Sequence, residues 1–260
     1  MGKVYLFVML FLLCCLSLTG YSKSWGNFKH YKQITDKEVL LETSNGAQIL
    51  ITAIDSQALQ ISASANKSFQ LIQPDQINKH KHLEGSIYVE ELDEMMQITT
   101  TTPEGIVICI NKKPFNLTYK SKANSNVLLN QSKISSNNRQ SASFEYKTCK
   151  TEKLRLLSCK STKNQWQNLE RGTLYPPDSI KAFSLGNNIY LVSSKGYSIL
   201  LEPNMAAQID LSESEKLKIS KLNIKQPLLQ FVLVLGTQQP ELLEKYAQIL
   251  TSKNRLISLK

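Results

Sequence analysis

Carboxylate side chains are concentrated in one short run of the sequence, "EELDE". Two carboxylates held close together can act as general acid and general base, and this is the chemistry that such a run could support. The run separates two apolar, β-branched stretches, so a hydrated turn between strands is the favoured interpretation. The residues of this acidic run are Glu90, Glu91, Asp93 and Glu94.

The histidines and the paired serines make no stronger case for catalysis. His80 and His82 occur in "KHKH", for which a solvated loop is favoured, and His30 has no neighbour in the sequence that would orient it. Ser193 and Ser194 have no histidine nearby and are interpreted as turn residues. We find no Cys-x-x-Cys motif, phosphate-binding loop or dinucleotide fingerprint. The sequence therefore predicts neither a metal site nor a cofactor.

The N-terminus has the pattern of a secretory signal peptide. Lys3 precedes an apolar run over residues 4–18, and small residues follow before Lys23. A membrane-spanning helix needs about 20 apolar residues, and this run is shorter. We expect a leader over residues 1–22 and a single domain over residues 23–260, secreted or periplasmic and not membrane-spanning. A lipoprotein anchor at Cys14 or Cys15 is the less favoured alternative.

Removal of the leader leaves three cysteines, which cannot all pair with one another. Cys109 lies in the apolar run "GIVICI" and is predicted to be a small buried hydrophobic residue. Cys149 and Cys159 could form one disulfide in an oxidising compartment, or could both remain free. The sequence leaves these two possibilities open.

The net charge of +10 is carried by the middle of the chain. Residues 112–181 contain 14 Lys and Arg against 4 Asp and Glu, so the remainder is balanced at 31 − 14 = 17 against 21 − 4 = 17. Such a segment could attract a polyanion, but a solvated, lysine-rich loop region is favoured. Aromatic residues are not interleaved as in single-stranded nucleic-acid binders, and export removes most nucleic acids as partners.

Most of the chain shows the alternation typical of β-strands. In "ALQISASA", Leu59, Ile61 and Ala63 share one face, and "LLQFVLVLG" is expected to be buried on both faces. Turn signals separate such runs, including "SNG" at residues 44–46 and "SSKG" at residues 193–196. The fold class predicted is an all-β, antiparallel β-sandwich. Two regions depart from the alternation.

The first, residues 121–182, is polar and turn-rich, and predicts a long exposed excursion with at most one short strand. The second is a C-terminal helix, predicted to begin at Pro240 and to end near Ser252. Its apolar residues recur at helical spacing, and we expect them to pack on another surface. They are Leu242, Leu243, Tyr246, Ile249 and Leu250.

The order of several motifs resembles a known family. "NGAQI" is followed by a strand ending in "INKKPF" and by "SSKGYSIL", and then by "PELLEKYAQILT". This order is similar to that of the N-terminal β-sandwich, a galactose-mutarotase-like supersandwich, of glycoside hydrolase family 31, the α-glucosidases and α-xylosidases. Arg171-Gly172 resembles an arginine-glycine pair that precedes a strand in that family. The likeness covers nearly all of residues 23–260.

The resemblance implies a module without chemistry of its own. Gln60 and Ser62 stand where family members usually carry arginines, no clear "yGlGe" stretch is present, and the family's "LTG" becomes Leu250-Thr251-Ser252. The family's two catalytic aspartates lie on a (β/α)₈ barrel that would follow Lys260. Retaining hydrolysis requires two carboxylates about 5 Å apart, so we expect no hydrolase activity from these 260 residues.

Sugar binding is the milder function that the resemblance implies. Trp166, Tyr175 and Asp178 lie in the region that would face a substrate, where an aromatic ring can stack on a sugar and polar groups can bind its hydroxyls. For these residues taken alone, the favoured interpretation is that Trp166 fills the core and Asp178 caps a turn. We expect a secreted accessory module that binds an α-linked glucan or oligosaccharide.

The alternatives are a structural or interaction protein that docks a separate hydrolase chain, or a truncated remnant of such an enzyme. The apolar tail, with Leu256, Ile257 and Leu259, is expected to be exposed for such a partner.

Overall fold

The structure is a computed structural model that describes residues 23–64, 85–137, 141–160, 163–176, 189–201, 206–222 and 228–236. The predicted leader, His80, His82, the C-terminal helix and the apolar tail lie outside these residues. Within them, no helix is both long enough and apolar enough to cross a membrane.

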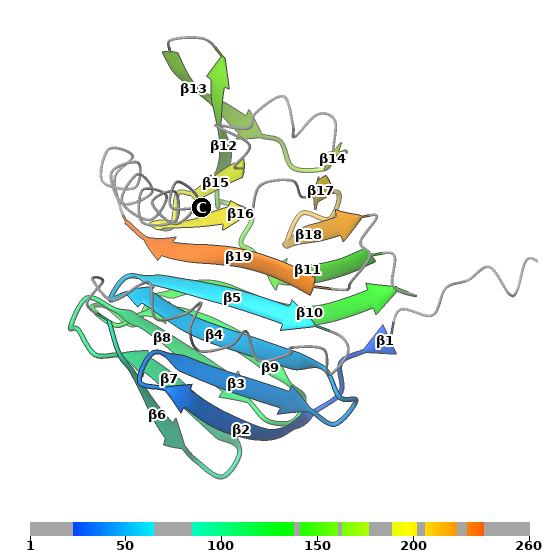
Figure 1. The fold of residues 1–260 in the computed structure, drawn as a ribbon. Helices are drawn as coiled ribbons and strands as arrows, with labels where there is room; N and C mark the ends of the chain where they lie inside the picture. Colours follow the sequence, from blue (N-terminus) through cyan, green and yellow to red (C-terminus); the bar gives the residue numbers. More distant parts are fainter. Residues whose placement is uncertain are drawn as a thin grey trace, which may run out of the picture.

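The described strands form two sheets, drawn one behind the other in Figure 1. Sheet A has ten strands in the part of the chain that the structure describes. Its order is β14 (Leu174–Tyr175), β17 (Ala206–Asp210), β18 (Lys216–Leu222), β11 (Ser141–Lys147), β10 (Val127–Asn137), β9 (Asn116–Ser121), β8 (Ile106–Asn111), β7 (Met95–Thr100) and β6 (Ile87–Glu91), with β1 (Lys23–Ser24) beside β10.

Sheet B has nine strands in the described residues. Its order is β13 (Lys163–Leu169), β12 (Leu154–Lys160), β15 (Ile189–Ser193), β16 (Tyr197–Leu201), β19 (Leu228–Leu235), β5 (Ala58–Ser64), β4 (Gln48–Asp55), β3 (Glu38–Thr43) and β2 (Phe28–Thr35). Neighbouring strands in both sheets are antiparallel. The predicted antiparallel β-sandwich is confirmed.

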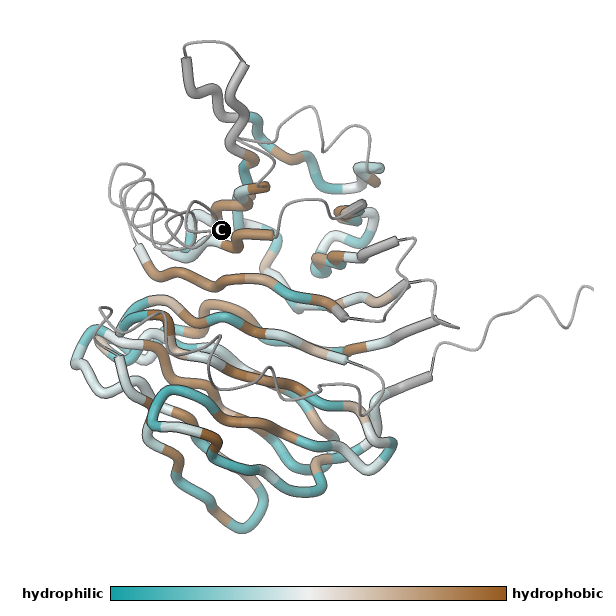
Figure 2. Tube along the Cα trace, viewed as in Figure 1, coloured by the Kyte–Doolittle hydropathy of each residue, from teal (hydrophilic) through white to brown (hydrophobic). Residues whose placement is uncertain are grey.

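The core lies between the sheets and is built by alternation. Leu59, Ile61 and Ala63 of β5 are fully buried, as predicted, and they belong to the same hydrophobic core as Ile106 and Ile108 of β8 in sheet A. Figure 2 shows hydrophobic residues recurring along the strands of both sheets. Because side chains on a strand alternate between its two faces, a period of two is sufficient to build this core.

Aromatic rings connect the two sheets. Phe144 of β11 meets Phe231 of β19 edge to face, with ring centroids 5.1 Å apart, and Tyr146 lies against the same ring at 6.3 Å. This arrangement places the positive edge of one ring against the negative face of another. Neighbouring residues of β19 are also buried, since Leu233 and Val234 are both 0% exposed. The prediction that this strand is buried on both faces is confirmed.

Two of the predicted turns are confirmed by their glycines. Gly46 and Gly196 have φ values of 79° and 83°, in the left-handed region that favours glycine. Gly196 closes the β15–β16 turn by donating to the carbonyl of Ser193.

The prediction that residues 121–182 form an exposed excursion is wrong. Strands β10 to β14 fall in this stretch, and three of them extend sheet A. Ala142, Phe144 and Tyr146 are buried, while Glu145 and Lys147 between and after them face outward. Polar residues lower the average hydropathy of the segment, so composition concealed the apolar alternation of β11.

The prediction that Cys109 belongs to the core is also wrong. In β8, Ile108 and Ile110 are fully buried, so the residue between them points to the opposite face. Cys109 is half-buried there and its thiol is free. Strand alternation, and not the apolar run around it, decides its position.

Candidate functional site

The structure does not bring together the three residues predicted to bind sugar. Trp166 lies on β13, where its backbone pairs with Leu157, but its side chain is outside the described part, as is all of Asp178. Tyr175 lies on β14 and packs partly against the core. Its hydroxyl accepts a hydrogen bond of 2.7 Å from the backbone N–H of Glu170. Tyr175 therefore anchors its own loop, and its hydroxyl proton is still available to an acceptor.

The acidic run lies only partly in the predicted turn, because Asp93 and Glu94 are in the β6–β7 turn whereas Glu90 and Glu91 end strand β6. Its four carboxylate residues are exposed in the hairpin between β6 and β7. Glu91 forms an ion pair of 2.9 Å with Lys112. His30, for which the sequence offered no orienting neighbour, has its Nε2 atom 3.8 Å from Glu42 of the adjacent strand.

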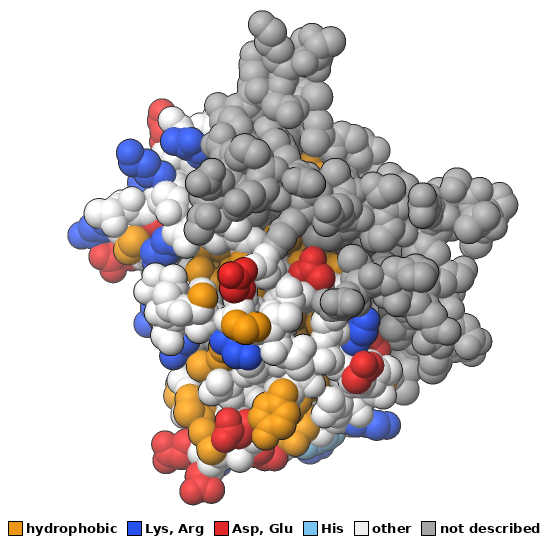
Figure 3. Space-filling model, turned by 90° about the vertical axis from the view of Figure 1, so that its left-hand side faces the viewer, with side chains coloured by type: hydrophobic (Ala, Val, Ile, Leu, Met, Phe, Trp, Pro, Cys, Tyr) orange, Lys and Arg blue, Asp and Glu red, His pale blue; other side chains and the backbone are white. Residues whose placement is uncertain are grey.

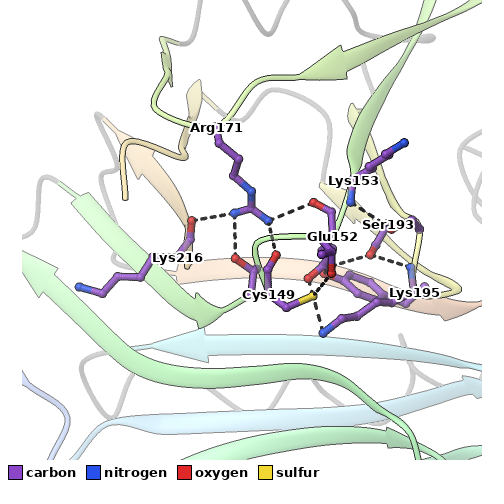
Figure 4. A network of polar contacts seen from close by, with 11 residues as sticks. Cys149, Glu152, Lys153, Arg171, Ser193, Lys195 and Lys216 are labelled. Carbon is purple, nitrogen blue, oxygen red and sulfur yellow. Dashed lines mark hydrogen bonds and ion pairs between the residues drawn. The ribbon is translucent and has the colours of Figure 1, made fainter. Parts of the chain in front are cut away.

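A buried carboxylate is the most developed polar feature of the described residues. Glu152 lies in the turn between β11 and β12, and its side chain is 1% exposed. Its Oε1 atom accepts hydrogen bonds from Ser193 Oγ at 2.5 Å and from Tyr197 OH at 2.7 Å. The Lys195 ammonium lies 3.6 Å from Oε2. We call these four residues the Glu152 cluster; Figure 4 labels Glu152, Ser193 and Lys195.

The hairpin β15–β16 positions three members of this cluster. Ser193 ends β15, Tyr197 begins β16, and the tight turn between them carries Lys195. The 3.6 Å between the Lys195 ammonium and Oε2 is too long for a hydrogen bond, so Oε2 has an opposite charge nearby but no hydrogen-bond donor. The Ser193 hydroxyl donates to the carboxylate and accepts from the backbone N–H of Lys195. Its hydrogen-bonding capacity is thereby largely used.

Arg171 holds the turn that carries Glu152. Its guanidinium donates to Thr148 Oγ1 at 2.8 Å and to the carbonyl oxygens of Cys149 and Glu152, both at 3.2 Å. It also reaches the carbonyl of Lys216 at 3.4 Å. The planar, multiply donating guanidinium suits this convergence of acceptors. The Arg171-Gly172 pair that the sequence singled out thus connects β18 to the turn before β12 (Figure 4).

Two groups at this site have shifted acidities. Burial raises the pKa of Tyr197 well above its ordinary value, and the negative charge of Glu152 raises it further. The hydrogen bond with Thr151 lowers the pKa of the Cys149 thiol, and the Lys195 ammonium acts in the same direction. Cys149 is half-buried, and its Sγ lies 3.4 Å from Thr151 Oγ1.

The structure also decides between the two possibilities for the cysteines. Cys149 carries a free thiol in the turn before β12, whereas Cys159 lies near the far end of that strand. At about 3.3 Å per residue, Cys159 is roughly 16 Å beyond Leu154, while a disulfide requires Cα atoms within about 7 Å. The two cysteines are therefore not paired.

The geometry of the Glu152 cluster is that of a structural clamp. A serine beside a carboxylate resembles an activated nucleophile, but the Ser193 hydroxyl is bonded on both sides and only 5% of the residue is exposed. The sequence contains no local signal for Glu152, because its partners Ser193 and Tyr197 lie 41 and 45 residues away along the chain. Within the described residues, no group of three or more His, Cys, Asp or Glu is placed to hold a metal ion.

No protein-family model and no curated protein matches this sequence. Solved structures do resemble it. The family 31 dextranase of Flavobacterium johnsoniae, complexed with glucose, matches with a TM-score of 0.62 and 18% identity, over 83% of this chain and 27% of the dextranase. The cycloalternan-forming enzyme from Listeria monocytogenes matches with a TM-score of 0.63 and 14% identity, over 87% of this chain and 22% of that enzyme.

A family 31 α-xylosidase from a soil metagenome, complexed with xylose, matches with a TM-score of 0.56 and 12% identity, over 80% of this chain and 32% of the xylosidase. Our chain thus spans between about a fifth and a third of the length of these enzymes. At such low identities the likeness shows the fold, which is that of a β-sandwich portion of family 31 glycoside hydrolases. The resemblance expected from the sequence is confirmed at this level.

Proposed function

We propose that this chain is an exported accessory module that binds an α-linked glucan or oligosaccharide and has no hydrolytic activity of its own. The observation that carries the proposal is the match of 83% of this chain to 27% of the dextranase. Another structure of that dextranase is complexed with isomaltotriose, and the Listeria enzyme with a pentasaccharide substrate. In this proposal, a module that shares a portion of their fold binds an α-linked glucan or oligosaccharide as well.

The Glu152 cluster has a supporting role in this proposal. It fixes the β15–β16 hairpin and the turn at residues 148–153, close to the loop that carries Tyr175. A binding surface needs loops held on a rigid scaffold, because ordering them on binding would cost affinity. The buried carboxylate thus contributes rigidity rather than chemistry.

Affinity electrophoresis of the purified chain over residues 23–260 tests the proposal. Dextran or a soluble starch in the gel should retard the protein, and the β-linked control barley glucan should not. Trp166→Ala should weaken the retardation, because the proposal assigns stacking on the sugar to this ring. Tyr88→Ala, which removes an exposed aromatic ring of β6, serves as the matched control. Equal mobility of the unaltered chain in gels that contain dextran, soluble starch or barley glucan would refute the proposed sugar binding.

A second assay tests the absence of hydrolysis separately. We expect no turnover of aryl α-glucosides or α-xylosides above the buffer blank. Release of the aryl group that survives repeated purification would show a catalytic site in this chain. The two assays are independent, so sugar binding and catalysis can be judged one at a time.

A further inference from the structure

Among the described strands, β6 is the last one at one end of sheet A. It pairs with β7 on one side, and in Figure 1 it lies at the lower left margin of the sandwich. Two backbone hydrogen bonds at the ends of the hairpin show which β6 residues bond to β7. The N–H of Thr101 donates to the carbonyl of Ser86 at 3.1 Å, and the N–H of Leu92 donates to the carbonyl of Met95 at 2.8 Å. Because bonded pairs alternate in an antiparallel ladder, Tyr88 and Glu90 are the β6 residues that bond to β7.

The other residues of β6 present their backbone groups to the outside. Ile87 is already satisfied, since its N–H donates to Asp36 at 2.7 Å and its carbonyl accepts from Gln33. Val89 and Glu91 follow it in the same phase. No described residue pairs with the backbone N–H or C=O of either residue. Together they offer two donors and two acceptors in the geometry of a β-ladder.

Apolar side chains flank this open backbone. Tyr88 is 63% exposed and Leu92 is 44% exposed, and both are among the few large hydrophobic residues exposed in the described part. Figure 3 shows hydrophobic side chains lying among acidic ones at the lower end of this side of the molecule. An apolar contact beside free backbone groups is the pattern by which extended segments are recognised.

The charges at this edge specify the kind of segment. Glu91 is neutralised by Lys112, but Glu90, Asp93 and Glu94 form no ion pair with any described residue. The edge is therefore negative on a chain whose net charge is +10. Two copies of β6 would oppose like charges, which disfavours pairing of this edge with itself. A segment that carries lysine or arginine complements it.

We infer that the β6 edge is a docking surface for an extended, Lys/Arg-rich segment of a partner protein, which adds to sheet A as a further strand. Val89 and Glu91 supply the backbone hydrogen bonds, and Tyr88 and Leu92 supply apolar contact. The carboxylates of the acidic run set the preference for basic side chains and raise the association rate. This inference does not rest on the proposed sugar binding, whose candidate residues Trp166 and Tyr175 lie on β13 and β14.

Fluorescence anisotropy with a labelled peptide of alternating lysine and valine, eight residues long, tests this inference on the purified chain. The decisive variant is Glu91→Pro, which removes an outward N–H. Proline is tolerated where an edge N–H faces solvent, so the sheet should persist. Its control is Glu91→Ala, which removes the same side chain and its ion pair with Lys112 but keeps the N–H. We expect at least tenfold weaker binding for the proline variant than for the alanine variant.

Two further measurements complete the test. Glu90→Lys should weaken binding of the lysine peptide and strengthen binding of a matched glutamate peptide, because it reverses one unpaired charge. Circular dichroism melts should show the same folded spectrum for all three variants. Equal affinity of the proline and alanine variants would mean that no strand is added, and the inference would be wrong. Absence of peptide binding to the unaltered chain at millimolar concentration would overturn it as well.

Discussion

Removal of the Glu152 carboxylate should be among the most damaging single changes in the described core. Glu152→Ala deletes an acceptor that is 1% exposed and receives two hydroxyl hydrogen bonds, from Ser193 at 2.5 Å and from Tyr197 at 2.7 Å. A hydrogen bond to a charged group contributes about 1.5–3 kcal/mol, and each orphaned hydroxyl also remains buried. The ion pair with Lys195 adds little, because the lysine side chain is 31% exposed.

The expected loss for Glu152→Ala is therefore about 4 kcal/mol in the free energy of unfolding, against a total of about 5–15 kcal/mol for a domain. Urea denaturation followed by the β-sheet circular dichroism signal measures it, provided that the m value is unchanged. Glu152→Gln should lose less, since an amide oxygen can still accept from both hydroxyls. The glutamine variant also keeps the test informative if the alanine variant does not fold.

A double-mutant cycle assigns the loss to the cluster. Tyr197→Phe alone should cost about 2 kcal/mol. In the Glu152→Ala background the same change should cost much less, because its partner is already gone. Glu213→Ala is the matched control: this glutamate pairs with Lys216 at 2.6 Å but is 65% exposed, and its removal should leave the unfolding midpoint unchanged. If Glu152→Ala lost less than about 1 kcal/mol, the clamp interpretation would be refuted.

Three further outcomes are expected. Burial raises the pKa of Tyr146 and of Tyr197, so the folded state keeps phenol protons that the unfolded state loses above about pH 10. Stability should therefore fall above pH 10 by up to about 1.4 kcal/mol per pH unit for each tyrosine, and Tyr146→Phe, which removes an unpartnered hydroxyl, should reduce the slope of urea midpoints against pH. The lowered pKa of the Cys149 thiol predicts alkylation by iodoacetamide at pH 8 that is faster than for a model thiol, and Thr151→Val should slow it; equal rates, read by mass spectrometry, would contradict this. Gly172→Ala should lower the unfolding free energy by about 1–2 kcal/mol through backbone strain alone, since φ is +82° and an added Cβ meets no atom within 4 Å; an unchanged urea midpoint would argue against that strain.

The sequence by itself determined the fold class and much of the core. The alternation in β5 and the continuous apolar run of β19 are local patterns, and each corresponds to one fixed side-chain direction on a strand. The turn before Tyr197 was equally readable, because a left-handed backbone favours glycine and Gly196 supplies it. Such features need only neighbouring residues, so no knowledge of the other sheet was required.

Predictions from the sequence were wrong where the average composition of a segment outweighed the alternation of its strands. In β11 the buried residues Ala142, Phe144 and Tyr146 alternate with polar ones, and the average polarity of the surrounding segment outweighed this alternation. Cys109 shows the converse error, since an apolar run suggested burial while the strand period turned its side chain to the other face. In both cases periodicity was the better guide than composition.

Only the tertiary structure decided the polar sites. Glu152 stands in an unremarkable polar turn, and it becomes a buried, doubly bonded carboxylate because β12 lies beside β15 and brings Ser193 and Tyr197 to it. The open edge of β6 likewise depends on which strand lies last in sheet A. Strand order is set by contacts between residues far apart in the chain, and the period of a single strand carries no information about its neighbours.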